Sequence, residues 1–312
     1  MVEIFFKTLP FFAIIGLGYF AAWRKFFSSE ATAYLTKFVF YFALSAMIFQ
    51  FSAKLSLSEF LNWKFVFAYL CASVIVYSLG FAVGLLRGIP LSHAAVEAQC
   101  CTIGNVGFLG IPMLALLLGP QAVGYVMIIL AVDMIVFGSL IVLLIVGSRE
   151  GRIKFSMMTN LVMGLVRNPM IMAIITGLCW SIFEIPLPDP LWEFVTLLGA
   201  ASTPCALFAI GASLVANTTE RVQTAAWIAF AKLVLHPLAV AIMALLVFKV
   251  DPYAASVMIV ASALPVAGNI YILAQHYQVA PQRVSASILV STVVSIFSIS
   301  LVINLAGSSF NF

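Results

Sequence analysis

Two apolar segments of membrane-spanning length are interrupted by residues that disfavour a continuous helix. In the segment Ala94–Leu118, three glycines and a proline fall between Gly104 and Pro112. The segment Pro252–Ala274 contains the run ALPVAGNI. Glycine weakens a helix interior, and proline removes a backbone donor. Because lipid offers no partner to a free N–H or C=O, these breaks must lie inside protein or beside a water-filled cavity.

The composition places the whole chain in a membrane. Of its 312 residues, 64% are hydrophobic and 8% are charged. A soluble domain of this size could not bury so much apolar surface. The N-terminus lacks a basic region and a small-residue cleavage site, so we expect the first apolar segment to be retained as a membrane span. The chain is therefore predicted to be an all-α, polytopic membrane protein with no nucleic-acid partner.

Ten segments have the length of about 20 apolar residues that a bilayer core requires. They are predicted at Ile4–Trp23, Tyr34–Ser52, Phe65–Leu86, Ala94–Leu118, Val123–Val146, Pro169–Phe183, Leu191–Val215, Val222–Phe248, Pro252–Ala274 and Arg283–Ala306. A polar linker separates the fifth span from the sixth.

The basic residues in the loops predict the orientation. One side carries four of them: Lys7, Lys54, Lys64 and Lys249. The other side carries nine: Arg24, Lys25, Arg87, Arg149, Arg152, Lys154, Arg167, Arg221 and Arg283. Lys37 and Lys232 lie within spans and are not counted. Since the more basic side faces the cytoplasm, both termini are expected outside the inner membrane.

The two halves of the chain are predicted to be inverted repeats. Residues 1–148 form the first five spans, residues 149–168 a cytoplasmic linker, and residues 169–312 the second five spans. An odd number of spans in each copy forces opposite topology, and interrupted spans in corresponding positions are typical of a transporter's binding site. Superposing Ala94-Ala95 on Ala254-Ala255 sets Asn105 opposite Pro265, so that both breaks fall at the same depth.

Three segments resemble the auxin efflux carrier family, which includes the plant PIN transporters and bacterial organic-acid permeases. They are TIGNVGFLGIPML in the fourth span, VRNPMIMAIITGLCWSIF in the sixth, and ALPVAGNIYILAQHYQVAP in the ninth. The resemblance extends over the whole chain in order. Plant crossovers carry proline before the asparagine, whereas this chain has Gly104 before Asn105.

The resemblance implies a fold like that of sodium–proton antiporters and bile-acid symporters. Spans four and nine would cross at mid-membrane. Spans 1, 2, 6 and 7 would form a scaffold, and spans 3–5 and 8–10 a moving transport domain. The resemblance also implies a homodimer formed through scaffold spans, and it gives Asn105 contact with the substrate carboxylate.

The residues at the two breaks are the first candidates for a substrate site. Half-helix N-termini present free N–H groups and a positive dipole end, which suit a carboxylate. Asn105 and Asn269 either add donors there or only satisfy freed backbone groups. Gly104, Gly268 and Pro265 are candidates too, and they either allow the crossing or touch the substrate. From span two, Leu44 and Ile48 either face the crossover or pack in the core.

Intramembrane charges are the second group of candidates, because they are costly and usually functional. Asp133 in span five and Lys232 in span eight either neutralise each other, bind a proton or cation and attract an anion, or form a static structural pair. His236 follows Lys232 by one helical turn and is either a core hydrogen-bond donor or a proton carrier. Glu97 is expected to be a solvated or interfacial charge.

These features predict a secondary active or facilitative carrier of small organic anions. Bacterial relatives point to malonate or malate, and plant relatives to auxin-like acids; an elevator-type alternating-access mechanism follows from the resemblance. The alternative is a sodium- or proton-coupled antiporter. An enzyme is not expected, since the chain lacks Walker A, Gly-x-Ser-x-Gly and His-Glu-x-x-His motifs. No cofactor or metal is expected.

Overall fold

The computed structural model describes residues 2–54, 62–150, 159, 163, 166–216 and 222–310, and every regular element in these ranges is helical. Most of the expected linker, residues 149–168, lies outside them. The helices are α1 (Val2–Trp23), α2 (Ser29–Phe38), α3 (Leu44–Ser52), α5 (Trp63–Leu86), α6 (Leu91–Thr102), α7 (Ile111–Leu118), α8 (Ala122–Val132), α9 (Gly138–Glu150), α11 (Pro169–Ile182), α12 (Asp189–Ala200), α13 (Ser202–Ser213), α14 (Val222–Phe230), α15 (His236–Ala241), α16 (Pro252–Ser262), α17 (Gly268–His276) and α18 (Pro281–Phe310).

The lengths and apolar character of these helices fit a polytopic membrane protein. Within the described residues, six continuous helical stretches are long and apolar enough to cross a bilayer: Ser29–Ser52, Trp63–Leu86, Ala122–Arg149, Asp189–Ser213, Val222–Val247 and Pro281–Ala306. Four shorter apolar helices are Leu9–Trp23, Val106–Leu118, Pro169–Ile182 and Pro252–Ser262. These four coincide with the first, fourth, sixth and ninth predicted segments.

Several of the long helices contain a π-helical turn. Such turns lie at Val39–Ala43 between α2 and α3, at Val106–Gly110 before α7, at Asp133–Phe137 between α8 and α9, and at Ala231–Leu235 between α14 and α15. A π-helical turn widens the helix locally and is frequent at functional sites. Two of the turns contain a predicted intramembrane charge, Asp133 or Lys232.

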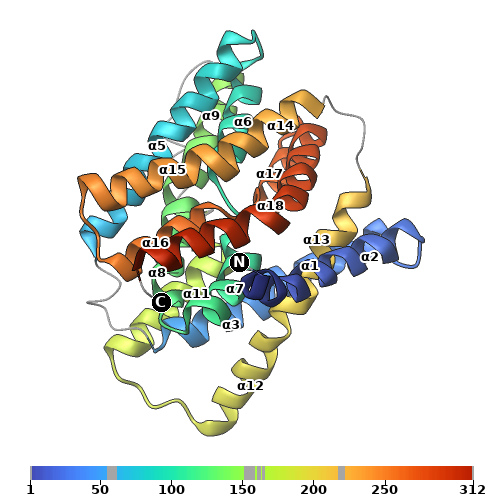
Figure 1. The fold of residues 1–312 in the computed structure, drawn as a ribbon. Coiled ribbons are helices and arrows are strands. Elements are labelled where there is room, and N and C mark those ends of the chain that lie inside the picture. Colours follow the sequence, from blue (N-terminus) through green and yellow to red (C-terminus); the bar gives the residue numbers. More distant parts are fainter. Residues whose placement is uncertain are drawn as a thin grey trace.

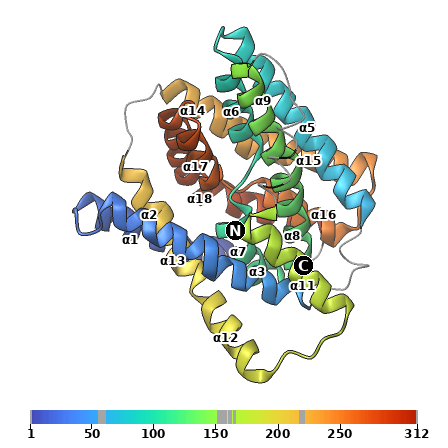
Figure 2. The same cartoon turned by 180° about the vertical axis from the view of Figure 1, so that it is seen from behind.

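The helices pack in two groups, which Figures 1 and 2 show from opposite sides. In one group α1 packs against α13, and α3 packs against α11 and α12. In the other group α5 contacts α6 and α15, while α18 contacts α14 and α16. Gly18 and Gly211 bring α1 and α13 together, because a Cβ atom at Gly211 would lie 1.8 Å from the carbonyl oxygen of Ile15. Small residues of this kind allow close helix approach in membranes.

The two broken segments meet at the centre of the second group. α6 ends at Thr102 and α16 ends at Ser262, Ile103 is extended, and a short antiparallel bridge pairs Gly104 with Val266. The Asn105 amide donates to the Pro265 carbonyl (2.8 Å), and the Ala267 amide donates to the Ile103 carbonyl (3.1 Å). Each break therefore satisfies backbone groups of the other, as lipid requires.

The breaks are shorter than the sequence suggested. Gly107 and Gly110 lie in the π-helical turn, and Pro112 stands at the start of α7, so the helix resumes at Val106. Proline is tolerated in a first helical turn because the N–H it lacks would have no partner there. Of the three glycines, Gly104 alone lies in the bridge.

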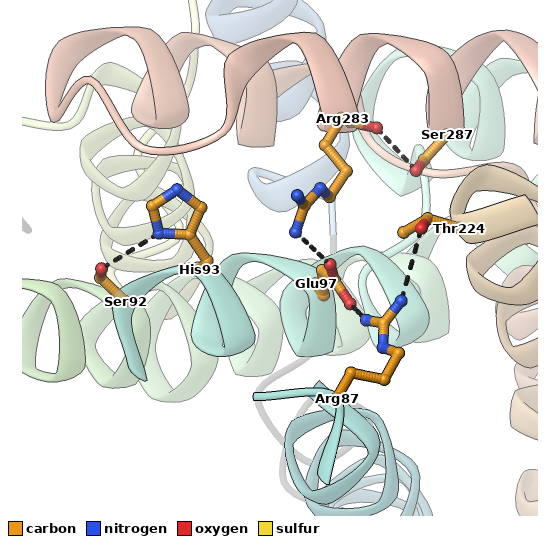
Figure 3. Close-up of polar contacts among 7 residues, drawn as sticks. All are labelled: Arg87, Ser92, His93, Glu97, Thr224, Arg283 and Ser287. Carbon is orange, nitrogen blue, oxygen red and sulfur yellow. Dashed lines mark hydrogen bonds and ion pairs between the residues drawn. The ribbon is translucent and has the colours of Figure 1, made fainter. Parts of the chain in front are cut away.

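A cluster of charges fixes the first turns of α6, and it corrects the prediction for Glu97. That carboxylate is not solvated; it is 1% exposed and lies between Arg87 and Arg283 (Figure 3). Arg283 Nη1 donates to Glu97 Oε1 (2.6 Å), and Arg87 also reaches Thr224 on α14 (3.4 Å). Partial burial, and secondarily Arg283, lower the pKa of the Arg87 guanidinium. The prediction failed because the partners come from outside α6: Arg87 follows α5, and Arg283 lies on α18, 186 positions away in the sequence.

Replacing Glu97 by Gln should therefore destabilise the protein. The neutral amide would remove the negative charge between two neighbouring guanidinium groups, at a cost of about 1.5–3 kcal/mol, the range for a hydrogen bond to a charged group. Chemical unfolding of the purified protein in detergent measures this change. Glu30→Gln, an exposed acid on α2, is the matched control. Equal stability of the two variants would show that the cluster contributes little.

Candidate functional site

A cavity of about 570 Å³ lies on one side of the crossover. It takes residues from α2, α6, both half-helices that follow the breaks, and the α8–α9 turn. Its volume is within the range of small-molecule sites, which are mostly apolar with a few convergent polar groups. Its polar lining residues are Thr36, Lys37, Tyr41, Gln99, Asn105, Asp133, Ser139, Asn168, Asn269 and Tyr277.

The beginnings of two half-helices face this cavity. Gly107 and Phe108 belong to the first turn after the first break, and Asn269 and Ile270 to the first turn of α17; all four line the cavity. The first N–H groups of a helix have no partner within the helix, and the end carries a partial positive charge. Two such ends converging on one cavity make it favourable for an anion.

Asn105 stands at the junction of bridge and half-helix. Its amide nitrogen is committed to Pro265, and its carbonyl oxygen accepts from Leu109 (3.1 Å) and Gly110 (3.0 Å). The side chain lines the cavity and is 5% exposed. It makes no hydrogen bond with any other described residue, so its carboxamide is available to a ligand.

Lys232 lies directly beneath the crossover. Its ammonium group donates to the Ser262 carbonyl, in the last turn of α16, and lies 3.2 Å from His236 Nδ1. A cation at a helix C-terminus offsets the negative dipole end. A Cβ atom at position 104 would be 3.2 Å from both Lys232 Cε and Nζ. Gly104 therefore lacks a side chain where the lysine head group needs the space.

A chain of polar side chains leads from Lys232 towards Asp133. His236 Nε2 is 3.0 Å from Ser73 Oγ, and the His236 ring packs edge-on against Tyr69, with centroids 5.8 Å apart. The Tyr69 hydroxyl donates to Asp133 Oδ1 (2.8 Å). In the described part of the chain, Asp133 and Lys232 form no direct ion pair. A buried set of polar side chains on α5, Tyr69 and Ser73, lies between the two charges, and whether the charges neutralise each other stays a prediction.

Three oxygen atoms of cavity-lining residues have no hydrogen-bond partner among the described residues. They are Asp133 Oδ2, Gln99 Oε1 and Asn269 Oδ1. Unpaired buried acceptors are costly, and native structures normally satisfy them with a proton donor, water or an ion. The three residues come from α6, the π-helical turn after α8, and α17, so the acceptors surround the crossover.

The remaining predicted site residues lie in the packed core or form the backbone of the crossover. Leu44 and Ile48 are fully buried, and neither lines the cavity. Leu44 does approach the crossover, since its Cδ2 is 3.7 Å from the position of a Cβ atom at Gly107. Pro265 supplies a carbonyl to the bridge, and Gly268 opens α17.

Seven of the ten polar lining residues are not among the predicted site residues, and Gln99 and Lys37 are two of them. Gln99, in the last turn of α6, is a neutral residue and gives no charge signal in the sequence. Lys37 was set aside as a lysine within a span, yet it lines the cavity from α2. The signal that could have found it is the charge itself, since a lysine within an apolar span is costly and usually functional.

Comparisons with known proteins identify the chain's family as one of membrane transporters. The family model described as "Membrane transport protein" matches residues 3–303. A Rhizobium meliloti protein named "Putative malonate transporter" is 28% identical over 305 residues, covering 96% of this chain and 94% of that protein. An Escherichia coli K12 protein named "Uncharacterized transporter YfdV" is 27% identical over 296 residues, covering 91% of each.

The Tyr69–Asp133 hydrogen bond predicts a measurable coupling. Tyr69→Phe removes the hydroxyl donor and should destabilise the protein by about 1–3 kcal/mol, because a buried carboxylate oxygen loses its partner. In an Asp133→Asn background the same change should cost less. Chemical unfolding of the four proteins in this cycle gives both values, and Tyr19→Phe, at an exposed tyrosine, is the control. An identical cost in both backgrounds would contradict the coupling.

Proposed function

Because the chain belongs to the membrane transport protein family, the auxin efflux carriers it resembles, we propose that it carries small organic anions across the inner membrane. The protein is a membrane transporter and not an enzyme, as the family match and the relatives indicate. The proposal adds a substrate class, and the observation behind it is the pair of half-helix N-termini converging on one cavity.

A carboxylate fits this arrangement best. The two positive helix ends and the uncommitted Asn105 carboxamide offer donors to a negative oxygen, and Lys232 adds a positive charge beneath the bridge. Asn269 and Gly104 complete the proposed substrate contacts. The Rhizobium protein's name mentions malonate, so malonate is the first acid to test; malate and auxin-like acids follow.

The proposed architecture is ten spans in two inverted five-helix repeats, residues 1–148 and 169–312. Four shorter apolar helices together with the six long ones give ten segments at the expected places. The bridge adds support: Asn105 hydrogen-bonds Pro265, the residue that the repeat superposition makes its equivalent. Antiparallel pairing centred on two equivalent residues is what a two-fold axis through the crossover would produce.

The proposed mechanism is an elevator movement of one helix group past the other. The two packing groups agree with a scaffold of spans 1, 2, 6 and 7 and a transport domain of spans 3–5 and 8–10. The cavity has lining residues from both, so relative movement would change its access. A homodimer through the scaffold remains part of the proposal, and the exposed apolar side chains of α12 (Leu191, Phe194 and Leu197) suit lipid or a second copy.

Ion coupling is the second candidate function, as a sodium- or proton-coupled exchanger. The unpaired oxygens of Asp133, Gln99 and Asn269 favour it, because a carboxylate with two amide oxygens suits a hard monovalent cation or a proton. The chain of polar side chains from Asp133 through Tyr69 and His236 to Lys232 would then link the bound ion to the crossover.

A thermal-shift screen separates these functions. Purified protein would be heated with malonate, malate, indole-acetate and neutral analogues, with and without sodium. A ligand that binds the folded state raises its stability by mass action. Stabilisation by an acid supports the carrier, and stabilisation by sodium alone supports the exchanger. Stabilisation by neither would contradict both.

Asn105→Ala should weaken acid binding while the protein stays folded. Loss of one hydrogen bond to a charged group corresponds to about 10- to 150-fold in affinity. Binding of the acid's neutral amide should change less, because the dipole argument needs the negative charge. Calorimetric titration of both ligands into both proteins measures the difference. An unchanged acid affinity would remove Asn105 from the site.

Cysteine labelling tests the orientation. In a Cys179→Ser background, which removes an exposed native thiol, Ser148→Cys should react with an impermeant thiol reagent only from the cytoplasmic side. Asp189→Cys, before α12, should react only from outside. Labelling of both positions from one side would contradict the ten-span topology.

A further inference from the structure

The cavity lining contains few charged side chains, and they differ in whether another residue already binds them. Among the described lining residues, Asp133 is the one acid and Lys37 the one base. Asp133 already accepts a hydrogen bond from Tyr69. Lys37 comes from α2, in the packing group that does not contain the crossover, so it faces the half-helix ends from another wall.

The Lys37 ammonium contacts an aromatic ring rather than an acid. The residue is exposed, and its Nζ lies 5.6 Å from the centroid of the Tyr34 ring, one turn earlier on α2. It forms no ion pair with any described acid. Lys37 is the ninth residue of α2, so it lies about 12 Å along the helix from its first residue, at a rise of about 1.5 Å per residue. A lysine at this position is compatible with a head group that turns into the cavity.

The two helix ends at the crossover can balance the charge of one carboxylate, but a second carboxylate in the cavity would need another positive group. A helix N-terminus carries about half a unit charge, so the two converging ends suit a single carboxylate. A second negative group held away from these ends would be costly in a mainly apolar lining unless it met a cation. Lys37 is the group that is positioned to meet it, and its flexible stem spans several ångströms.

We propose that Lys37 binds the second carboxylate of the substrate and makes the carrier selective for dicarboxylates over monocarboxylates. This inference rests on the proposed function, since it assumes that a first carboxylate binds at the crossover. It makes Lys37 a specificity-determining residue rather than a lysine that only extends towards lipid head groups. Because the stem is flexible, dicarboxylates of neighbouring chain length should compete.

The test compares malonate with malonamate, which has nearly the same shape but one carboxylate. Calorimetric titration at neutral pH would give the affinity of each ligand for the wild type, Lys37→Met and Lys37→Arg. The wild type should prefer malonate. Lys37→Met should lose about 10-fold or more in malonate affinity and change less than about 2-fold for malonamate. Lys37→Arg should recover most of the loss because it keeps the charge.

Lys54→Met is the matched control. Lys54 also stacks on an aromatic ring, with Nζ 4.3 Å from the Trp192 centroid, but it does not line the cavity. An equal loss for both ligands in Lys37→Met would assign that residue a structural role and overturn the inference, as would an unchanged malonate affinity. If the wild type bound malonamate and not malonate, the proposed selectivity for dicarboxylates would be wrong, while the proposed transport of organic anions would still be supported. Binding of no acid at all would overturn both.

Discussion

The need to satisfy backbone groups in lipid governs the centre of this protein. Two helices stop within the membrane, and each stop leaves carbonyl and amide groups that the bilayer cannot bind. The bridge at Gly104 and Val266 satisfies part of them mutually, and Ser291 Oγ accepts from the Val266 amide (3.1 Å). The remaining helix ends face the cavity, where a solute can reach them. The unpaired backbone groups of the two interrupted helices thus account both for the bridge between them and for the proposed anion site.

The charges near the bridge follow from these helix ends. Lys232 donates to the last turn of α16, so the negative end of that half-helix meets a cation. The buried lysine is connected through His236, Ser73 and Tyr69 to Asp133, which keeps one carboxylate oxygen unpaired. An unpaired oxygen beside a cavity is costly to keep. Such a cost is expected where a protein binds something in one of its working states.

The sequence predicted the elements well, because membrane spans are encoded by long apolar runs and breaks by glycine and proline. The location of both breaks, and the equivalence of Asn105 and Pro265 in the two halves, could be read from the sequence; the hydrogen bond between them could not. The inferred substrate contacts and the ten-span repeat remain predictions. Glu97 and the Asp133–Lys232 contact were harder, since their partners Arg87, Arg283 and Tyr69 come from other spans. Only the packed fold brings those side chains together.

Side-chain orientation was the other limit. Apolar spans carry little periodic signal, so the sequence did not show which face of span two turns to the cavity. Leu44 and Ile48 are predicted either to face the crossover or to pack in the core; both are buried, and Thr36, Lys37, Phe40 and Tyr41 line the cavity instead. The π-helical turn at Val39–Ala43 contains Phe40 and Tyr41, and it changes the helical register between Lys37 and Leu44. A register shift of this kind cannot be read from spacing that assumes 3.6 residues per turn.

The contact between Gly104 and Lys232 has a consequence for how sequences of this fold can diverge. The lysine head group occupies the volume that a side chain at position 104 would need. A bulkier residue there, such as the proline of the plant crossovers, fits only if the residue at position 232 is shorter or takes another rotamer. The two positions are distant in the chain, yet their side chains compete for the same space. Substitutions at the two positions should therefore be accepted in combination, and residues 104 and 232 should covary among proteins of this fold.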